Sequence, residues 1–212
     1  MLDEKTQEVL KNKFGAMKDN VSLLFFNSDN PENCEYCKEI NQLLEELSTI
    51  SNGKILYNKY NLASNEAKNY SIKDAPAIVM FGSSKRNIHY YGIPAGYEFN
   101  AFIQTILDIS KGEPDVSKEL KDKVKAIDFP VHIKVFVSPS CPYCPGAMKV
   151  ANDFALLNDK IIADVYEVTE FREIAMKYDV SGVPKTVIND IVELSGAYPP
   201  DIVLQKIQTL KE

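Results

Sequence analysis

Apolar and polar positions along the first half of the chain predict an alternation of helices and strands. Residues 2–17 carry the apolar stripe of an amphipathic helix, and the apolar run Val21 to Phe26 is short enough for a buried strand. Apolar residues then recur at helical spacing from Ile40 to Ile50, and this helix is expected to end near Asn52-Gly53. Further strands are expected at 55–60, 77–81 and 87–91, and helices at 66–70 and 99–107.

The same order of elements follows a polar segment, Ser110 to Asp115, which contains both Gly and Pro and is therefore a domain boundary by its composition. We expect one unit at 1–112 and a second at 113–212. The second unit is expected to contain helices at 116–127, 147–155, 171–178 and 202–210, and strands at 131–137, 161–168, 186–188 and 191–195.

Landmarks in the two halves keep nearly the same separation. Cys34 and Cys141 are 107 positions apart, and Pro76 and Pro184 are 108 apart. The segment Asn-Tyr-Ser-Ile at 69–72 falls on Lys-Tyr-Asp-Val at 177–180 with the second of these shifts. One supersecondary unit of about 100 residues is therefore present twice.

Composition excludes several classes of partner. The chain has 212 residues, of which 45% are hydrophobic, and a net charge of −6. A nucleic-acid-binding protein would instead carry a clustered basic face. The N-terminus has no apolar signal region, and no apolar stretch approaches the length of a membrane span. We expect a soluble, cytoplasmic protein that has neither a nucleic acid nor a membrane as its partner.

All four Cys lie in two CxxC motifs, Cys34-Glu35-Tyr36-Cys37 and Cys141-Pro142-Tyr143-Cys144. Each motif follows a predicted strand and opens a predicted helix, which is the setting of redox-active thiols. The first Cys is expected at the start of the helix, where unpaired N–H groups favour the thiolate. The second Cys, one turn later, can attack a mixed disulfide formed at the first.

The two motifs and the later prolines give the chain a resemblance to the thioredoxin superfamily, twice over. Two such units resemble the protein disulfide oxidoreductases of archaea and thermophilic bacteria, and the second motif is similar to a glutaredoxin active site. The resemblance implies an α/β fold, in which each unit has a central mixed sheet flanked by helices and a Pro-led hairpin on its antiparallel side. It implies redox-active disulfides as the only cofactor and no metal. It also implies protein thiols or disulfides as substrates and a thioredoxin-reductase-like electron donor.

The resemblance further implies that Pro76 and Pro184 form cis peptide bonds facing the two CxxC motifs. The backbones of Ala75 and Val183 would then pair with an extended substrate peptide. Many thioredoxins have a buried Asp six residues before the first Cys, where this chain has Ser28 and Val135. The proton acceptor for Cys37 or Cys144 is therefore open. Glu167 is one candidate, although we expect it to be exposed.

Three other positions have structural interpretations. His89 and His132 lie in predicted strands far in sequence from the CxxC motifs, and we expect structural or solvated roles for them. Tyr90-Tyr91 is expected in an edge strand.

Several functional alternatives remain open. Two CxxC motifs can form a Cys₄ zinc site, although such pairs usually lie 15–20 residues apart and these are more than 100 apart. The first motif could be vestigial. Glu35 disfavours the Cys34 thiolate, so the second motif is expected to dominate. The chain could also be an electron relay to a peroxidase-type client, or a peptide-binding module that needs no thiol. The direction of exchange, whether reduction, oxidation or isomerisation, is not fixed by the sequence.

Overall fold

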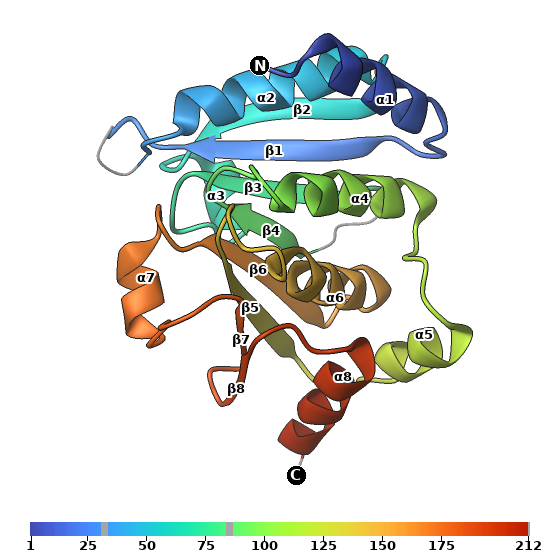
Figure 1. The fold of residues 1–212 in the computed structure, drawn as a ribbon, viewed down its shortest axis with the longest axis vertical. Coiled ribbons are helices and arrows are strands. Elements are labelled where there is room, and N and C mark those ends of the chain that lie inside the picture. The colour runs from blue at the N-terminus through green and yellow to red at the C-terminus, as the bar shows by residue number, and fades with distance from the viewer. Residues whose placement is uncertain (31–33, 84–86, 212) are drawn as a thin grey trace.

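The computed structural model describes residues 1–30, 34–83 and 87–211, and it contains every helix and strand that the sequence predicts (Figure 1). Part of the expected hairpin turn after Gly82 lies outside the described residues. Among the described residues, no helix combines the length and apolar character that crossing a membrane needs. The first half contains α1 (Glu4–Gly15), β1 (Val21–Asn27), α2 (Cys37–Ile50), β2 (Ile55–Asn61), α3 (Asn65–Asn69), β3 (Ala77–Phe81), β4 (Ile88–Tyr91) and α4 (Glu98–Lys111). The second half contains α5 (Lys118–Lys125), β5 (Val131–Val137), α6 (Cys144–Leu157), β6 (Ile161–Glu167), α7 (Arg172–Lys177), β7 (Lys185–Ile188), β8 (Val192–Ser195) and α8 (Pro200–Gln208), followed by the short 3₁₀ helix Thr209–Lys211.

The strands form one mixed sheet of eight strands in the order β2-β1-β3-β4-β6-β5-β7-β8. Within each half, β1 is parallel to β2 and β5 is parallel to β6. The strands after each proline are antiparallel, because β3 pairs with β1 and β4, and β7 pairs with β5 and β8. The antiparallel side predicted for both hairpins is therefore confirmed.

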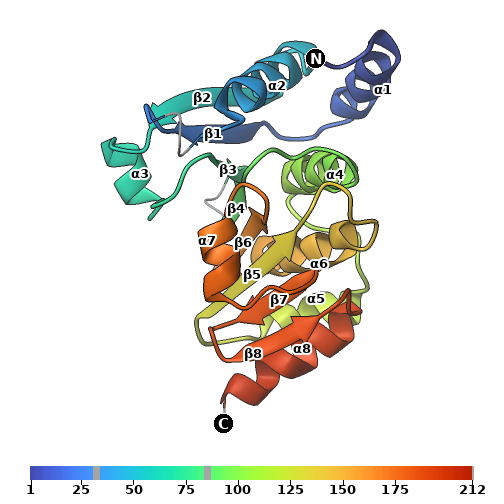
Figure 2. The ribbon, with the colours of Figure 1, turned by 60° about the vertical axis from the view of Figure 1, so that its left-hand side comes forward.

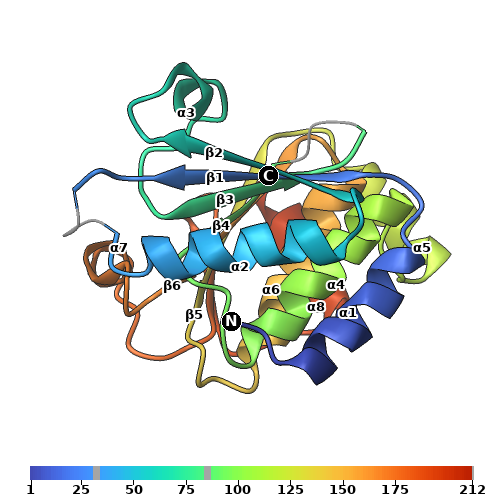
Figure 3. The same ribbon diagram turned by 90° about the horizontal axis from the view of Figure 1, so that it is seen from above.

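Helices cover both faces of the sheet, and strand alternation divides the core between them (Figures 2 and 3). On β1, Leu23 and Phe25 point to the face covered by α1, α2, α4, α5, α6 and α8. Leu24 and Phe26 point to the opposite face, where the aromatic core packs against α3 and α7. A strand buried on both faces reads as a continuous apolar run, which is what the sequence has here.

The two halves are joined by parallel pairing of β4 with β6. The sequence prediction of an edge strand at Tyr90-Tyr91 is therefore wrong, since β4 lies in the middle of the sheet. Tyr90 is fully buried, and the ring of Tyr91 stacks on Tyr166 of β6 with 4.4 Å between centroids. The aromatic pair closes the seam between the halves instead of facing solvent.

A buried polar group also crosses this seam. Asp164 on β6 bonds Nδ1 of His89 on β4 at 2.8 Å and Nε2 of His132 on β5 at 2.6 Å. Burial by itself raises the pKa of Asp164, but the hydrogen bonds from His132 and His89 outweigh it and hold the pKa well below its usual range. The structural role expected for the two His residues is confirmed.

The strand directions place both CxxC motifs at the same edge of the sheet. Because β1, β4, β6 and β5 all run parallel, the carboxyl ends of β1 and β5 lie at one edge. Four strand spacings separate β1 from β5, which at roughly 4.8 Å each is about 19 Å.

Candidate active sites

The second CxxC motif forms a disulfide, Cys141–Cys144, in the turn between β5 and α6, with 5.5 Å between the Cα atoms. Helix α6 begins at Cys144, so the helix starts at the second Cys and not, as the sequence suggested, at the first. The first Cys still uses the helix start, because its Sγ accepts a hydrogen bond from the Cys144 N–H at 3.1 Å. This donor favours negative charge on the Cys141 sulfur when the couple is reduced.

The two sulfurs of this couple differ in access to solvent. Cys144 is fully buried, whereas 8% of Cys141 is exposed at the surface. Tyr143 between them is 71% exposed, which places an aromatic ring beside the accessible sulfur. The arrangement suits Cys141 for contact with another protein and Cys144 for the internal step.

The loop before β7 faces this disulfide, as the family resemblance implies. The Val183–Pro184 peptide bond is cis, which confirms that prediction. The Sγ of Cys141 lies 3.6 Å from the carbonyl oxygen of Val183. Strand pairing of β7 begins only at Lys185, so the backbone of Val183 stands next to the sulfur and ahead of the paired strand.

The first half of the chain supports this second couple through the loop before α4. The N–H of Tyr97 donates to the carbonyl of Pro139, two residues before Cys141, at 3.0 Å. Gly96 has φ +58°, and a Cβ there would collide with the same Pro139 carbonyl. Only glycine allows this approach without strain. The sequence analysis missed this contact, and a single Gly in a loop is too weak a signal to have revealed it.

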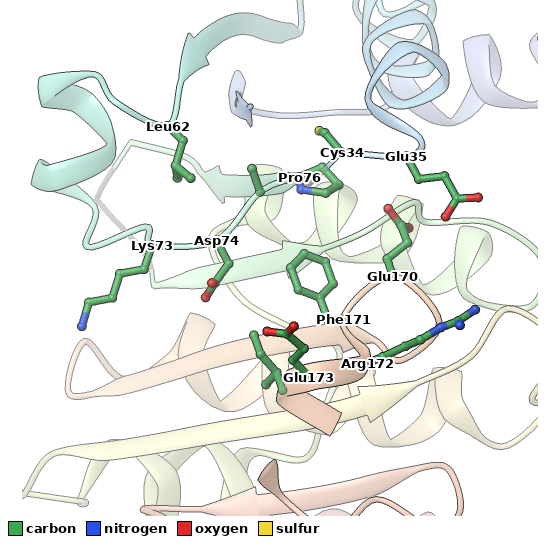
Figure 4. A pocket seen from close by; sticks show the side chains of 12 residues that line it. Cys34, Glu35, Leu62, Lys73, Asp74, Pro76, Glu170, Phe171, Arg172 and Glu173 are labelled. Carbon is green, nitrogen blue, oxygen red and sulfur yellow. The ribbon is translucent and has the colours of Figure 1, made fainter. Parts of the chain in front are cut away.

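The first motif also forms a disulfide, Cys34–Cys37, with 5.2 Å between its Cα atoms, and α2 begins at Cys37. Cys34 is 8% exposed and lines a pocket of about 400 Å³ together with Ala75 and Pro76 (Figure 4). The Ala75–Pro76 bond is cis, as predicted. Both couples thus have the same local construction.

The two couples differ in their electrostatic surroundings. The first has Glu35 between its sulfurs and Glu170, from the second half, in the same pocket. The charge of Glu35, with burial and the charge of Glu170, raises the pKa of Tyr36 above its ordinary value. The second couple has the uncharged Pro142 and Tyr143 between its sulfurs. Negative charge near a thiol disfavours the thiolate, so the first couple has the less reactive environment.

Buried carboxyl groups occupy the space between the two couples. Glu167, expected at the surface, is 1% exposed, because its carboxylate accepts hydrogen bonds from Thr169 and from the Glu170 N–H. Glu98, which the sequence analysis missed, is fully buried at the start of α4 and accepts a 2.5 Å hydrogen bond from the Tyr90 hydroxyl. Burial raises the pKa of Glu98 to about 7 despite this bond.

The four sulfurs do not converge as a Cys₄ zinc site requires, because they are paired within their own motifs about 19 Å apart, at roughly 4.8 Å per strand spacing. In the parts of the chain that the structure describes, no group of three or more His, Cys, Asp or Glu side chains is arranged to hold a metal ion.

Comparison with known proteins gives consistent results. The thioredoxin domain family matches residues 131–209. The alkyl hydroperoxide reductase protein AhpF from Staphylococcus aureus strain Mu50 is 27% identical over 191 residues, which cover 89% of this chain and 34% of that protein. The chain therefore spans about a third of the length of the curated relatives it matches.

Two solved structures resemble the whole chain. A protein disulfide oxidoreductase from Aeropyrum pernix K1 is 28% identical with a TM-score of 0.88, covering 98% of this chain and 93% of that one. The NTD_N/C domain of alkylhydroperoxide reductase AhpF from Enterococcus faecalis, at 21% identity and a TM-score of 0.87, shares the fold over 97% of this chain and 99% of that one. The chain therefore belongs to the thioredoxin superfamily, with two tandem thioredoxin-fold units that each carry a disulfide-forming CxxC site.

Proposed function

We propose that this protein transfers electrons by thiol–disulfide exchange, with Cys141 and Cys144 as its main couple and a hydroperoxide-reducing protein as its client. The observation that carries the proposal is the geometry of the second site. An accessible sulfur at the start of a helix lies 3.6 Å from the Val183 carbonyl, with its partner sulfur sealed beneath it.

In the reduced protein, the Cys141 thiolate attacks one sulfur of a client disulfide. The client S–S bond breaks, one client sulfur leaves as a thiolate, and a mixed disulfide with Cys141 remains. Cys144 then loses its proton and attacks the Cys141 sulfur, which restores the internal disulfide and releases the second client thiolate. Two electrons pass to the client, and a thioredoxin-reductase-like donor returns them to the couple.

The backbone beside each couple supports protein clients. Val183 and Pro184 at the second site, and Ala75 and Pro76 at the first, lie next to the accessible sulfur and ahead of the paired strand. An extended peptide could add its backbone there as a further strand. The exposed rings of Tyr143 and Tyr97 offer apolar contact around the second site.

The client class follows from the AhpF relatives, which are named as part of alkyl hydroperoxide reductase and align with 89% of this chain. A separation of about 19 Å, four spacings of roughly 4.8 Å, prevents direct sulfur contact between the two couples. Electrons would therefore enter and leave the second couple through partner proteins, and the first couple would not be an obligatory step.

A second candidate is general exchange on many protein disulfides. It is favoured by the A. pernix protein disulfide oxidoreductase, because that chain and this one match over almost their whole lengths. Here both couples would act separately on unfolded or misfolded proteins.

The experiment is NADPH oxidation with a bacterial thioredoxin reductase, a two-cysteine peroxiredoxin and tert-butyl hydroperoxide. We expect the wild type and Cys34→Ser/Cys37→Ser to support turnover, and Cys141→Ser/Cys144→Ser to abolish it. Insulin reduction by dithiothreitol is measured in parallel. Insulin reduction without peroxide turnover would favour the second candidate, and failure of both assays would refute thiol–disulfide exchange.

A further inference from the structure

The pocket at the first couple is built by both halves of the chain. The first half contributes Cys34, Glu35 and Leu62 with residues 73–76, and the second half contributes residues 170–174. Figure 4 shows the second-half side chains rising from below toward the cysteine. In this arrangement the second unit supplies chemistry that the first unit lacks, since Ser28 stands where many thioredoxins have an acidic residue.

Glu170 is the residue of this wall that is placed for chemistry. Its side chain points from the second unit toward Cys34 and Glu35 (Figure 4). One oxygen, Oε1, accepts a hydrogen bond from the Ile93 N–H at 2.6 Å, which fixes the carboxyl group. The other oxygen, Oε2, is buried and has no hydrogen-bond partner among the residues that the structure describes. A Cβ at Gly92 would collide with Glu170 Oε1, so the glycine makes room for the carboxyl group.

Several charged groups face this carboxyl. Glu167 lies at the end of β6, Glu35 and Tyr36 precede α2, and Tyr90 belongs to β4. Lys73, Asp74, Arg172 and Glu173 line the rest of the pocket. Burial, followed by the charges of Glu167 and Glu35, raises the pKa of Glu170 to about 7. At neutral pH a group with this pKa can both accept and donate a proton.

We propose that Glu170 of the second unit is the proton-exchanging residue of the Cys34–Cys37 couple. The inference rests on the proposed thiol–disulfide exchange and assigns a residue to it. When a dithiol reduces the couple, its first thiolate attacks Cys34, the Cys34–Cys37 bond breaks, and Cys37 leaves as a thiolate that is protonated from solvent. The second thiolate of the donor attacks its own sulfur in the mixed disulfide. This step releases Cys34 as a thiolate and oxidises the donor to a disulfide.

Glu170 then gives its proton to the Cys34 thiolate and is left as a carboxylate, which solvent reprotonates. In the opposite direction the carboxylate removes the proton from the Cys34 thiol before attack. Each unit therefore depends on the other: the first holds the turn of the second couple through Tyr97, and the second exchanges protons with the first couple through Glu170.

The test uses the full chain with Cys141→Ser/Cys144→Ser, so that only the first couple can cycle. The rate of its reduction by dithiothreitol is measured from pH 5 to 9 and divided by the concentration of dithiothreitol thiolate. We expect this corrected rate to fall about tenfold or more as pH rises through 7, because the carboxylic acid form of Glu170 is lost. With Glu170→Gln the corrected rate should stay level across this range.

Two controls separate this role from a structural one. Glu173→Gln removes a charge from the same wall and should keep the bend near pH 7, and Glu170→Asp keeps a carboxyl and should also bend. A Glu170→Gln profile with the wild-type bend would overturn the proposal, as would a level profile for both Glu170→Asp and the unsubstituted background. A first disulfide that dithiothreitol cannot reduce at any pH would instead refute exchange at the first couple, whatever the role of Glu170.

Discussion

Glu98 gives the chain a stability that depends on pH, and its replacement by Gln measures the effect. The carboxyl is fully buried, accepts a hydrogen bond from Tyr90, and has a folded pKa of about 7 against an ordinary value of 4.5. The folded state therefore prefers the protonated form. Stability is not affected by this group below the unfolded pKa, falls as pH rises from about 4.5 to about 7, and stays reduced above that.

The size of the effect follows from the pKa difference. About 2.5 units, at about 1.4 kcal/mol per unit, amounts to roughly 3 kcal/mol of lost stability above pH 7. Gln has nearly the shape of the protonated Glu and cannot ionise, so the Tyr90 hydroxyl keeps an acceptor. Glu98→Gln should therefore be about as stable as wild type near pH 4.5 and more stable by up to about 3 kcal/mol at pH 8.

Urea unfolding followed by far-ultraviolet circular dichroism, with both disulfides intact, measures this difference from pH 4.5 to 9. Other buried carboxyls such as Glu170 titrate in both proteins, so the difference between the two curves isolates Glu98. Glu8→Gln, at an exposed position of α1, is the matched control and should follow the wild-type curve. A Glu98→Gln curve parallel to wild type across the whole range would refute the reasoning.

Three further predictions follow from contacts described above. Gly96→Ala should destabilise the protein by about 1–3 kcal/mol and slow insulin reduction, because its Cβ meets the Pro139 carbonyl; an unchanged urea midpoint would contradict this. Asp164→Asn should cost about 3–5 kcal/mol at pH 7. The lowered pKa of Asp164 means that wild type, unlike the variant, should lose this stability in urea titrations as pH falls below the unfolded pKa of about 3.8. Iodoacetamide at pH 7 should modify Cys141 faster than Cys34 in the reduced protein, and mass spectrometry showing the reverse order would disprove it.

Local patterns in the sequence were sufficient to predict the order of elements and the construction of each site. The helix Cys37–Ile50 and the strand Val131–Val137 match their apolar patterns closely, because short-range periodicity reports which face is buried. The cis bonds at Pro76 and Pro184 were predicted from the family resemblance and are confirmed.

Contacts between the two halves were not predictable in this way, because they join residues far apart in sequence. Tyr90-Tyr91 was misplaced at an edge, although the run Ile88-His89-Tyr90-Tyr91 has no solvent-facing polar alternation and could have indicated burial on both faces. Glu98 and Glu170 looked like ordinary acidic residues near helix starts, which are usually exposed. Their burial depends on the packing of one unit against the other, and neither unit's sequence contains that information alone.

The pairing of β4 with β6 bears on any attempt to produce either half separately. A fragment ending near residue 112 would present β4 as a bare margin of unsatisfied amide and carbonyl groups, with Tyr91 uncovered, and a fragment starting there would do the same with β6 and Tyr166. Such margins recruit a second copy of themselves. Half-length fragments should therefore self-associate, and the intact chain escapes that fate by supplying each margin with its own complement.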